Sequence, residues 1–362
     1  MSLESLAQEK FKELYTQESE ISFEQLVQLY VEKQDGERNP FLIKEYTSKA
    51  EVRKNETVIY TPGGGGDGTL NFELNYIQAI LEQGYDVITI RHCGLNPFKV
   101  DGRRLLNLNQ SEIQSVISKN NQVGELNYVD WSLEPLSVLE YVAENYPEIK
   151  SAKLIGHSYA GMSNRISMYK FATNNPASTL RISNVVELSP ANYSQELKWS
   201  DYEGWEYFFE SLTLWRTYNG VQPAEEQLSQ VVETTMRDKS IRSALRKLYP
   251  NTNFAVVIPA GDTYVSQDVG KILQHDIPNG VLVVRQDYPS SASEINEFRN
   301  NPTASSGAER NKVFKENGGA GEIHDGNQLT PKQLIDLLEI RGIGRTEGLV
   351  PNTTRTDKLI GI

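Results

Sequence analysis

A serine with the surroundings of a catalytic nucleophile lies near the middle of the chain. The segment 153–161 reads KLIGHSYAG, so a short apolar run ends at Gly156 and Ser158 follows two residues later. This pattern is typical of the sharp strand–turn–helix bend that raises a serine hydroxyl above a sheet. Small neighbours such as Ala160 are needed, because larger side chains would collide with the strand or the next helix. The sequence therefore predicts Ser158 as a nucleophile and the N–H of Tyr159 as an oxyanion donor.

A glycine-rich turn is the second segment that could contribute to chemistry. Residues 61–68 read TPGGGGDG, and four consecutive glycines allow close backbone approach and present N–H groups to negative charge. We expect Gly65 or Gly66 to supply the second oxyanion donor beside Tyr159, and the sequence does not choose between them. Phosphate binding is the competing interpretation. The turn lacks the Lys-Ser/Thr of a Walker motif, and no suitably placed acid follows it as in a dinucleotide site.

Composition and charge exclude several classes of protein. The 362 residues suffice for one large α/β domain with an insertion, and the net charge of -12 argues against nucleic acid or an anionic membrane as partner. The single Cys93 excludes an internal disulfide, and the histidines show no metal-ligand spacing, so neither a metal nor a cofactor is expected. No apolar run has the length of a membrane span and no signal peptide is evident. We expect a cytoplasmic protein with a small-molecule substrate, and the oligomeric state is left open.

The spacing of apolar residues predicts a sheet covered by helices. Strands are expected at 57–60, 86–90, 153–155, 183–188, 253–258 and 281–284, with one or two edge strands within 41–53. Helices are expected at 72–83, 131–145, 266–275, directly after the serine turn, and from Pro331 onward. Apolar strands that alternate with amphipathic helices indicate a parallel sheet with helices on both faces.

These features, taken in chain order, resemble the α/β-hydrolase fold superfamily over roughly residues 42–340. The glycine run after the first buried strand, the serine turn, a helical insertion after the next strand, and a later acid and histidine follow that family's order. The resemblance implies an eight-stranded, mostly parallel sheet with a helical cap above the carboxyl ends of its strands. The expected parts are an N-terminal helical extension (1–40), a core (41–190 and 251–340), a helical cap (191–250), a long loop insertion (288–322) and an irregular tail (341–362).

The family's order of serine, acid and histidine implies the two partners of Ser158. The acid is expected at the end of a strand beyond the cap, where Asp262 follows an apolar run. Glu187, at the end of the preceding strand, is the alternative acid. The base is expected on a loop before the last helix, where His324 precedes the helix cap Thr330. Elimination supports this choice, because the other histidines lie after an earlier strand, at the nucleophile itself, or in a predicted helix: His92, His157 and His275.

The predicted cap is dense in aromatic residues between positions 199 and 218. As part of a cap, such rings would line an acyl or alcohol pocket with flat apolar surface. We expect Trp205 and Trp215 to contact substrate. The alternative is that the rings only pack the cap onto the core.

Together these residues predict a serine hydrolase that cleaves a carboxylic ester, thioester or amide of a small, hydrophobic or aromatic substrate. Ser158 would attack the carbonyl, His324 would move the proton, and Asp262 would orient the imidazole before water releases the acyl group. Acyl transfer to another acceptor would use the same residues. Two alternatives stay open: a non-catalytic ligand-binding protein with this fold, and a peptidase of the iminopeptidase type with an acidic subsite formed by Asp201, Glu203, Glu206 and Glu210.

Overall fold

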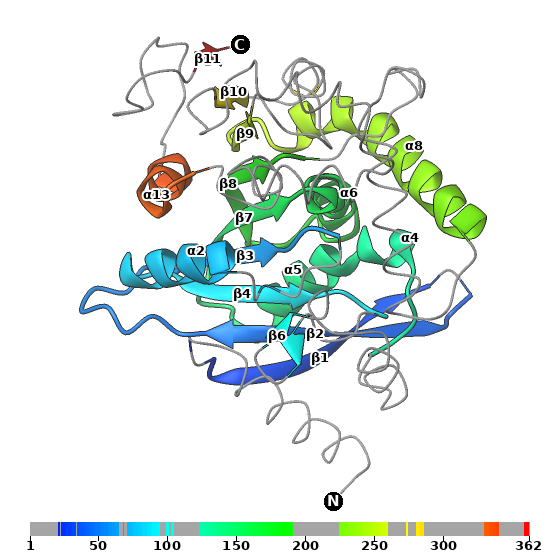
Figure 1. Cartoon of the computed structure of the whole chain (residues 1–362), viewed down its shortest axis with the longest axis horizontal. Helices are drawn as coiled ribbons and strands as arrows, with labels where there is room; N and C mark the ends of the chain where they lie inside the picture. The colour runs from blue at the N-terminus through cyan, green and yellow to red at the C-terminus, as the bar shows by residue number, and fades with distance from the viewer. Residues whose placement is uncertain are drawn as a thin grey trace, which may run out of the picture.

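The computed structural model describes residues 21, 23–33, 35–64, 68, 71–94, 99–100, 103–104, 123–190, 224–259, 273, 280–285, 329–339 and 358–361. Within these residues the main sheet has nine strands, which lie side by side in this order (Figure 1): β1 (Gln25–Glu32), β2 (Arg38–Tyr46), β4 (Asp86–Arg91), β3 (Glu56–Thr61), β7 (Ser151–His157), β8 (Arg181–Leu188), β9 (Asn253–Pro259), β10 (Gly280–Arg285) and β11 (Lys358–Gly361). The strands from β4 to β10 run parallel, whereas β1 and β2, β2 and β4, and β10 and β11 pair antiparallel. The prediction of a mostly parallel α/β sheet is therefore confirmed.

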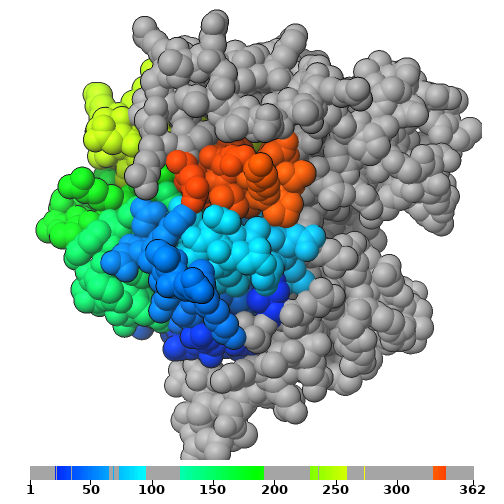
Figure 2. Space-filling view, turned by 90° about the vertical axis from the view of Figure 1, so that its left-hand side faces the viewer, coloured from blue at the N-terminus to red at the C-terminus, as the bar shows by residue number. Residues whose placement is uncertain are grey.

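Helices cover both faces of the sheet (Figure 1). One face carries α2 (Asn71–Glu82) and α13 (Pro331–Glu339), which lie next to each other on the surface in Figure 2; the other carries α4 (Tyr128–Trp131), α5 (Glu134–Asn145), α6 (Tyr159–Asn174) and α8 (Ala224–Leu248). Successive strand residues point to opposite faces. In β7, Leu154 packs in the core beneath α5, α6 and α8, whereas Ile155 packs beneath α2 and α13. The expected helices on both faces are confirmed.

The described part of the sheet has nine strands rather than the expected eight. One additional strand is β11, in the tail that was expected to be irregular. Its residues Leu359 and Ile360 pair with Val283 and Leu282 of β10. Local sequence contains no strong signal for so short a strand. It forms because the outer side of β10 offers backbone groups that a partner strand can pair.

The N-terminal region corrects a second prediction, because Gln25–Glu32 and Arg38–Tyr46 form strands rather than helices. Glu24 donates its N–H to the carbonyl of Glu45 at 2.8 Å, and β1 then pairs with β2 along its whole length. Gly36, at φ 85°, makes the turn between the two strands. The Asp-Gly pair at this turn is a strong hairpin signal, and it explains why strand pairing prevails over helical spacing. The core therefore includes residues before position 41, such as Phe23 and Leu26.

Other predicted elements agree with the structure. Helix α2 ends just before Gly84, which has φ 90°, and α6 begins directly after Ser158. Thr330 and Gln333 form the expected cap of α13: the Gln333 N–H donates to Thr330 Oγ1 at 3.2 Å, and the Thr330 N–H donates to Gln333 Oε1 at 2.9 Å. None of the helices in the described ranges is both apolar and long enough to span a bilayer.

The second half of the predicted cap is the long helix α8. It packs against α6 and α4 and buries Val231 and Leu245 in the core, so residues 224–248 belong to the helical layer beside the sheet. Residues 191–223 lie outside the described residues. A cap over the strand ends formed by that segment stays a prediction.

Candidate active site

Ser158 lies at a sharp bend between β7 and α6. Its φ and ψ are 55° and -120°, a conformation that residues with a side chain rarely adopt. The surrounding backbone fixes the bend: the Ser158 N–H donates to the carbonyl of Leu188 at 2.8 Å, and the Gly161 N–H donates to the carbonyl of Ser158 at 3.1 Å. The Ser158 side chain does not cap α6, although it precedes the first helical residue. The serine is therefore held in a strained turn at the carboxyl end of a parallel strand.

Tight packing around this bend explains the small residues in the sequence. A Cβ atom on Gly156 would lie 2.6 Å from Nδ2 of Asn164 and 2.9 Å from the backbone of Ala160. A Cβ atom on Gly161 would lie 2.5 Å from Cβ of Pro190. These distances are shorter than van der Waals contact, so the expected need for small residues on both sides of the serine is confirmed.

The start of the glycine turn lies against the serine. A Cβ atom on Gly63 would lie 2.7 Å from Nδ1 of His157 and 3.2 Å from Cβ of Ser158. The structure thus brings together the two segments that the sequence predicted to supply oxyanion donors. Gly65 and Gly66 themselves lie outside the described residues.

Tyr159 is the first residue of α6, and the first N–H groups of a helix have no partner within the helix. Its side chain is buried away from the turn. The hydroxyl donates to the carbonyl of Tyr128 at 2.7 Å and lies 2.8 Å from Oγ1 of Thr234. The ring therefore attaches the start of α6 to α4 and α8, and only the backbone of Tyr159 is suited to the predicted oxyanion role.

Four other predicted site residues lie outside the described residues: Asp262, His324, Trp205 and Trp215. The four acidic residues of the iminopeptidase alternative and the 288–322 loop lie there as well. The strand that leads to Asp262 is described. β9 ends at Pro259, and it is separated from β7 by β8 alone. The carboxyl ends of β7 and β9 therefore meet at the same edge of the sheet.

The alternative acid, Glu187, belongs to a buried ion network. Arg165 Nη1 donates to Glu187 Oε2 at 2.6 Å, and Arg165 Nε donates to Asp238 Oδ1 at 2.7 Å. Arg242 Nη1 completes the network by donating to Asp238 Oδ2 at 3.0 Å. These four side chains join β8, α6 and α8, and all are buried. Glu187 is therefore already paired with Arg165, whereas Asp262 as the orienting acid stays a prediction. The sequence had given no signal of this network.

The titration of Glu187 gives a prediction about stability. Burial raises the pKa of Glu187 to about 7, and this outweighs the attraction of Arg165. The folded protein therefore holds a proton on Glu187 more tightly than the unfolded chain does, and this stabilises the fold. The stabilisation is fully present below the usual pKa of 4.5 and is lost as the pH rises through about 7. Relative to Glu187→Gln, which cannot titrate, the wild-type free energy of unfolding should fall by up to about 3 kcal/mol across this interval. Urea unfolding of both proteins between pH 5 and 8 tests this, and two parallel pH profiles would contradict it.

Two further candidate residues, His92 and Cys93, directly follow β4. Burial and the nearby carboxylates of Glu134 and Asp130 raise the pKa of the Cys93 thiol well above its usual value, so this cysteine is not an activated nucleophile. His92, set aside as a catalytic base, is buried between Glu134 and the carbonyl of Pro62. The sequence offered one signal that His92 could contribute to the site. It directly follows β4, which runs parallel to β7 and ends on the same side of the sheet as Ser158.

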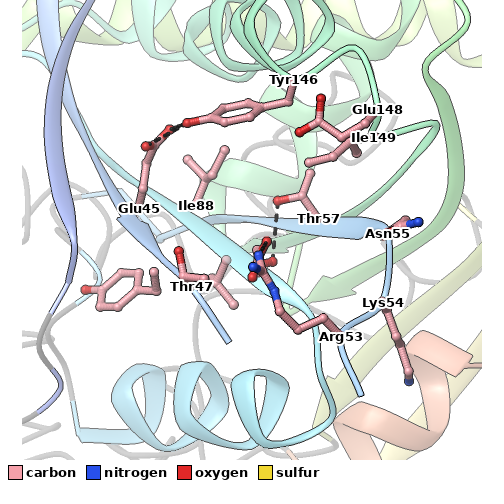
Figure 3. A pocket seen from close by; sticks show the side chains of 13 residues that line it. Glu45, Thr47, Arg53, Lys54, Asn55, Thr57, Ile88, Tyr146, Glu148 and Ile149 are labelled. Atoms are coloured by element: carbon pink, nitrogen blue, oxygen red, sulfur yellow. Dashed lines mark hydrogen bonds and ion pairs between the residues drawn. The ribbon is translucent and has the colours of Figure 1, made fainter. Parts of the chain in front are cut away.

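A surface pocket of about 410 Å³ lies at the opposite edge of the sheet (Figure 3). Its lining includes Thr57 and Asp86 at the amino ends of β3 and β4, where Arg53 forms an ion pair with Asp86. Figure 3 shows the side chain of Tyr146 pointing toward Glu45. The Tyr146 hydroxyl lies 3.0 and 3.1 Å from the two carboxylate oxygens of Glu45. Ligands of open α/β sheets bind outside the carboxyl ends of the strands, so we do not assign the predicted chemistry to this pocket.

No protein-family model and no curated protein matches the chain. Solved structures with a similar arrangement include an esterase from Pyrobaculum calidifontis, with 16% identity and TM-score 0.44 over 78% of this chain and 84% of that chain. They also include the esterase Pf2001 of Pyrococcus furiosus (18% identity, TM-score 0.42, 73% of this chain and 81% of that chain) and the esterase EaEST of Exiguobacterium antarcticum (14% identity, TM-score 0.42, 76% of this chain and 97% of that chain). Since these identities and TM-scores are low, no function of this chain is concluded from the likeness.

Proposed function

We propose that this protein is a serine hydrolase that cleaves a carboxylic ester, thioester or amide. The observation that carries the proposal is the backbone of Ser158, which has φ 55° between β7 and α6 and lies in contact with the glycine turn. A strained conformation of this kind costs about 1–3 kcal/mol and persists where the surrounding structure imposes it, which is common at catalytic nucleophiles.

The proposed mechanism uses acyl transfer through Ser158. His324 removes the proton from the hydroxyl as the oxygen attacks the carbonyl carbon, and Asp262 orients the imidazole. The backbone N–H of Tyr159 and one N–H of the glycine turn stabilise the negative charge on the tetrahedral intermediate. His324 then protonates the leaving group, and a water molecule activated by the same imidazole releases the acyl group from Ser158.

The proposed substrate is small and hydrophobic or aromatic. This follows from the aromatic segment 199–218, in which Trp205 and Trp215 are the proposed contacts. A panel of chromogenic esters with graded acyl chains is the direct measure of this preference.

Covalent labelling tests the proposal. A fluorophosphonate probe reacts with activated serines, so we expect the wild-type protein to be labelled at a single site and peptide mapping to place the adduct on Ser158. Ser158→Ala should not react. The matched control is Ser163→Ala, because Ser163 is a buried serine on α6, the helix that directly follows Ser158, and its loss should leave labelling unchanged. A folded wild-type protein that is neither labelled nor active on the ester panel would indicate a non-catalytic ligand-binding protein.

A further inference from the structure

His92 and Glu134 form a fully buried pair beside the proposed active site. The side chains of both residues are 0% exposed, and His92 Nδ1 lies 2.5 Å from Glu134 Oε2. The other ring nitrogen, Nε2, lies 3.0 Å from the backbone carbonyl oxygen of Pro62. Pro62 lies at the start of the glycine turn, directly before Gly63, so the pair connects the start of α5 to the turn that faces Ser158.

The protons of this pair follow from the hydrogen-bond geometry. A carbonyl oxygen can only accept, so Nε2 of His92 carries a hydrogen and donates it to Pro62. Glu134 Oε1 accepts the N–H of Cys93 at 2.7 Å, so this oxygen carries no hydrogen. One further proton lies between Nδ1 and Oε2, and the pair is neutral as a whole whichever atom holds that proton. A neutral, fully hydrogen-bonded pair is a stable arrangement in a buried site.

Neighbouring groups prevent the imidazole from tilting. The ring of Trp131 stacks on the ring of His92 with centroids 4.6 Å apart and 20° between the planes. Trp131 Nε1 also donates to the carbonyl of Cys93 at 2.8 Å. Glu134 itself lies in the first turn of α5, where a carboxylate is favoured by the helix dipole. The direction of the bond from Nε2 to Pro62 is therefore fixed.

The bond to Pro62 determines how the glycine turn leaves β3. The peptide group between Pro62 and Gly63 is planar and trans, so an anchored carbonyl also fixes the direction of the Gly63 N–H. Four consecutive glycines could otherwise adopt many backbone conformations. Gly63 is also the residue whose backbone lies against Ser158, so a change in the peptide plane would be transmitted directly to the oxyanion donors.

We propose that His92, held by Glu134, is a positioning residue that sets the path of the glycine turn and thereby the placement of its oxyanion donor. The inference rests on the proposed hydrolase function. Since the oxyanion is present in the transition state and not in the bound substrate, loss of this bond lowers kcat and leaves KM nearly unchanged. A misplacement of about 1 Å can lower a rate about 10²-fold.

Two substitutions separate positioning from stability. The amide nitrogen of asparagine can occupy the position of Nδ1, so His92→Asn keeps a donor to Glu134 and loses the bond to Pro62. The amide nitrogen of glutamine can occupy the position of Nε2, so His92→Gln keeps the bond to Pro62 and loses the donor to Glu134. We expect kcat for an ester substrate to fall about 10–10²-fold in His92→Asn and clearly less in His92→Gln. The unfolding midpoint should fall more in His92→Gln, because Glu134 is left buried without its histidine partner.

The two measurements give distinguishable outcomes. The positioning role is supported if His92→Asn has the lower kcat and His92→Gln has the lower unfolding midpoint. Equal kcat values, or kcat losses that follow the stability losses, overturn it and leave His92 as a packing residue. Ester hydrolysis and labelling of Ser158 are measured on the wild-type protein before the variants are compared. If the wild-type protein shows neither, the result contradicts the proposed function and not the role of His92.

Discussion

Ser158→Ala is expected to lower kcat/KM for a chromogenic ester by at least about 10⁴-fold, because neighbouring residues cannot replace the nucleophile of the proposed triad. The fold should persist in this variant. The bend is held by backbone hydrogen bonds and by the close contacts of Gly63, Gly156 and Gly161, and the serine side chain makes no capping bond to α6. Steady-state hydrolysis and thermal unfolding of the same preparations measure both effects.

The partners of Ser158 are identified by the same assay. Residues that act as a unit are non-additive, so the double variant Ser158→Ala with His324→Ala should be no slower than Ser158→Ala alone. Asp262→Asn should lower kcat by about 10³–10⁴-fold, whereas Glu187→Gln should retain most of the activity. A larger loss of kcat in Glu187→Gln than in Asp262→Asn would assign the acid to Glu187 in spite of its ion pair with Arg165. Full activity in Ser158→Ala would overturn the mechanism.

Arg165→Met is expected to lower the free energy of unfolding by about 3–5 kcal/mol. Arg165 is fully buried and donates to Glu187 at 2.6 Å and to Asp238 at 2.7 Å. Its removal leaves Glu187 without its cationic partner in a region that excludes water, and the desolvation cost of that carboxylate is no longer offset. Urea unfolding with an unchanged m-value would show that the loss is one of stability.

The matched control for this substitution is on α8. Arg237 forms an ion pair with Glu233 at 2.6 Å, but their side chains are 30% and 53% exposed. Exposed pairs contribute about 0–1 kcal/mol, so Arg237→Met should have little effect on stability. Equal losses in Arg165→Met and Arg237→Met would show that burial of the network has no energetic consequence.

Much of the fold was predictable because its signals are local. The central strands are continuous apolar runs, and Gly84 and Thr330 mark a helix end and a helix start in the expected way. The N-terminal hairpin was missed because Leu26, Val27, Tyr30 and Val31 satisfy helical spacing, while the strand depends on pairing with β2. Strand β11 depends in the same way on a distant partner, which spacing within the segment does not reveal.

The same distinction between local and long-range signals applies to the candidate site. The bend at Ser158 was predictable because its requirements for small residues lie within a few positions of the serine. The buried pairs were not: Arg165 meets residues 22 and 73 positions away, and His92 meets a residue 42 positions away. Charged residues at such separations resemble surface residues in the sequence. Only the sheet order brings them together.

The place of β7 in the sheet has a consequence for folding kinetics. β7 pairs with β3 on one side and with β8 on the other, and Ile155 lies opposite Tyr60, from a distant part of the chain. Pairing between segments so far apart closes a long loop and slows folding relative to local structure. The unfavourable backbone conformation of Ser158 is held in part by residues distant in the sequence, since its N–H donates to Leu188 and Gly63 lies against it. We therefore expect the bend at Ser158 to form late in folding, so that recovery of fluorophosphonate labelling, if Ser158 is the proposed nucleophile, follows the return of helical circular dichroism.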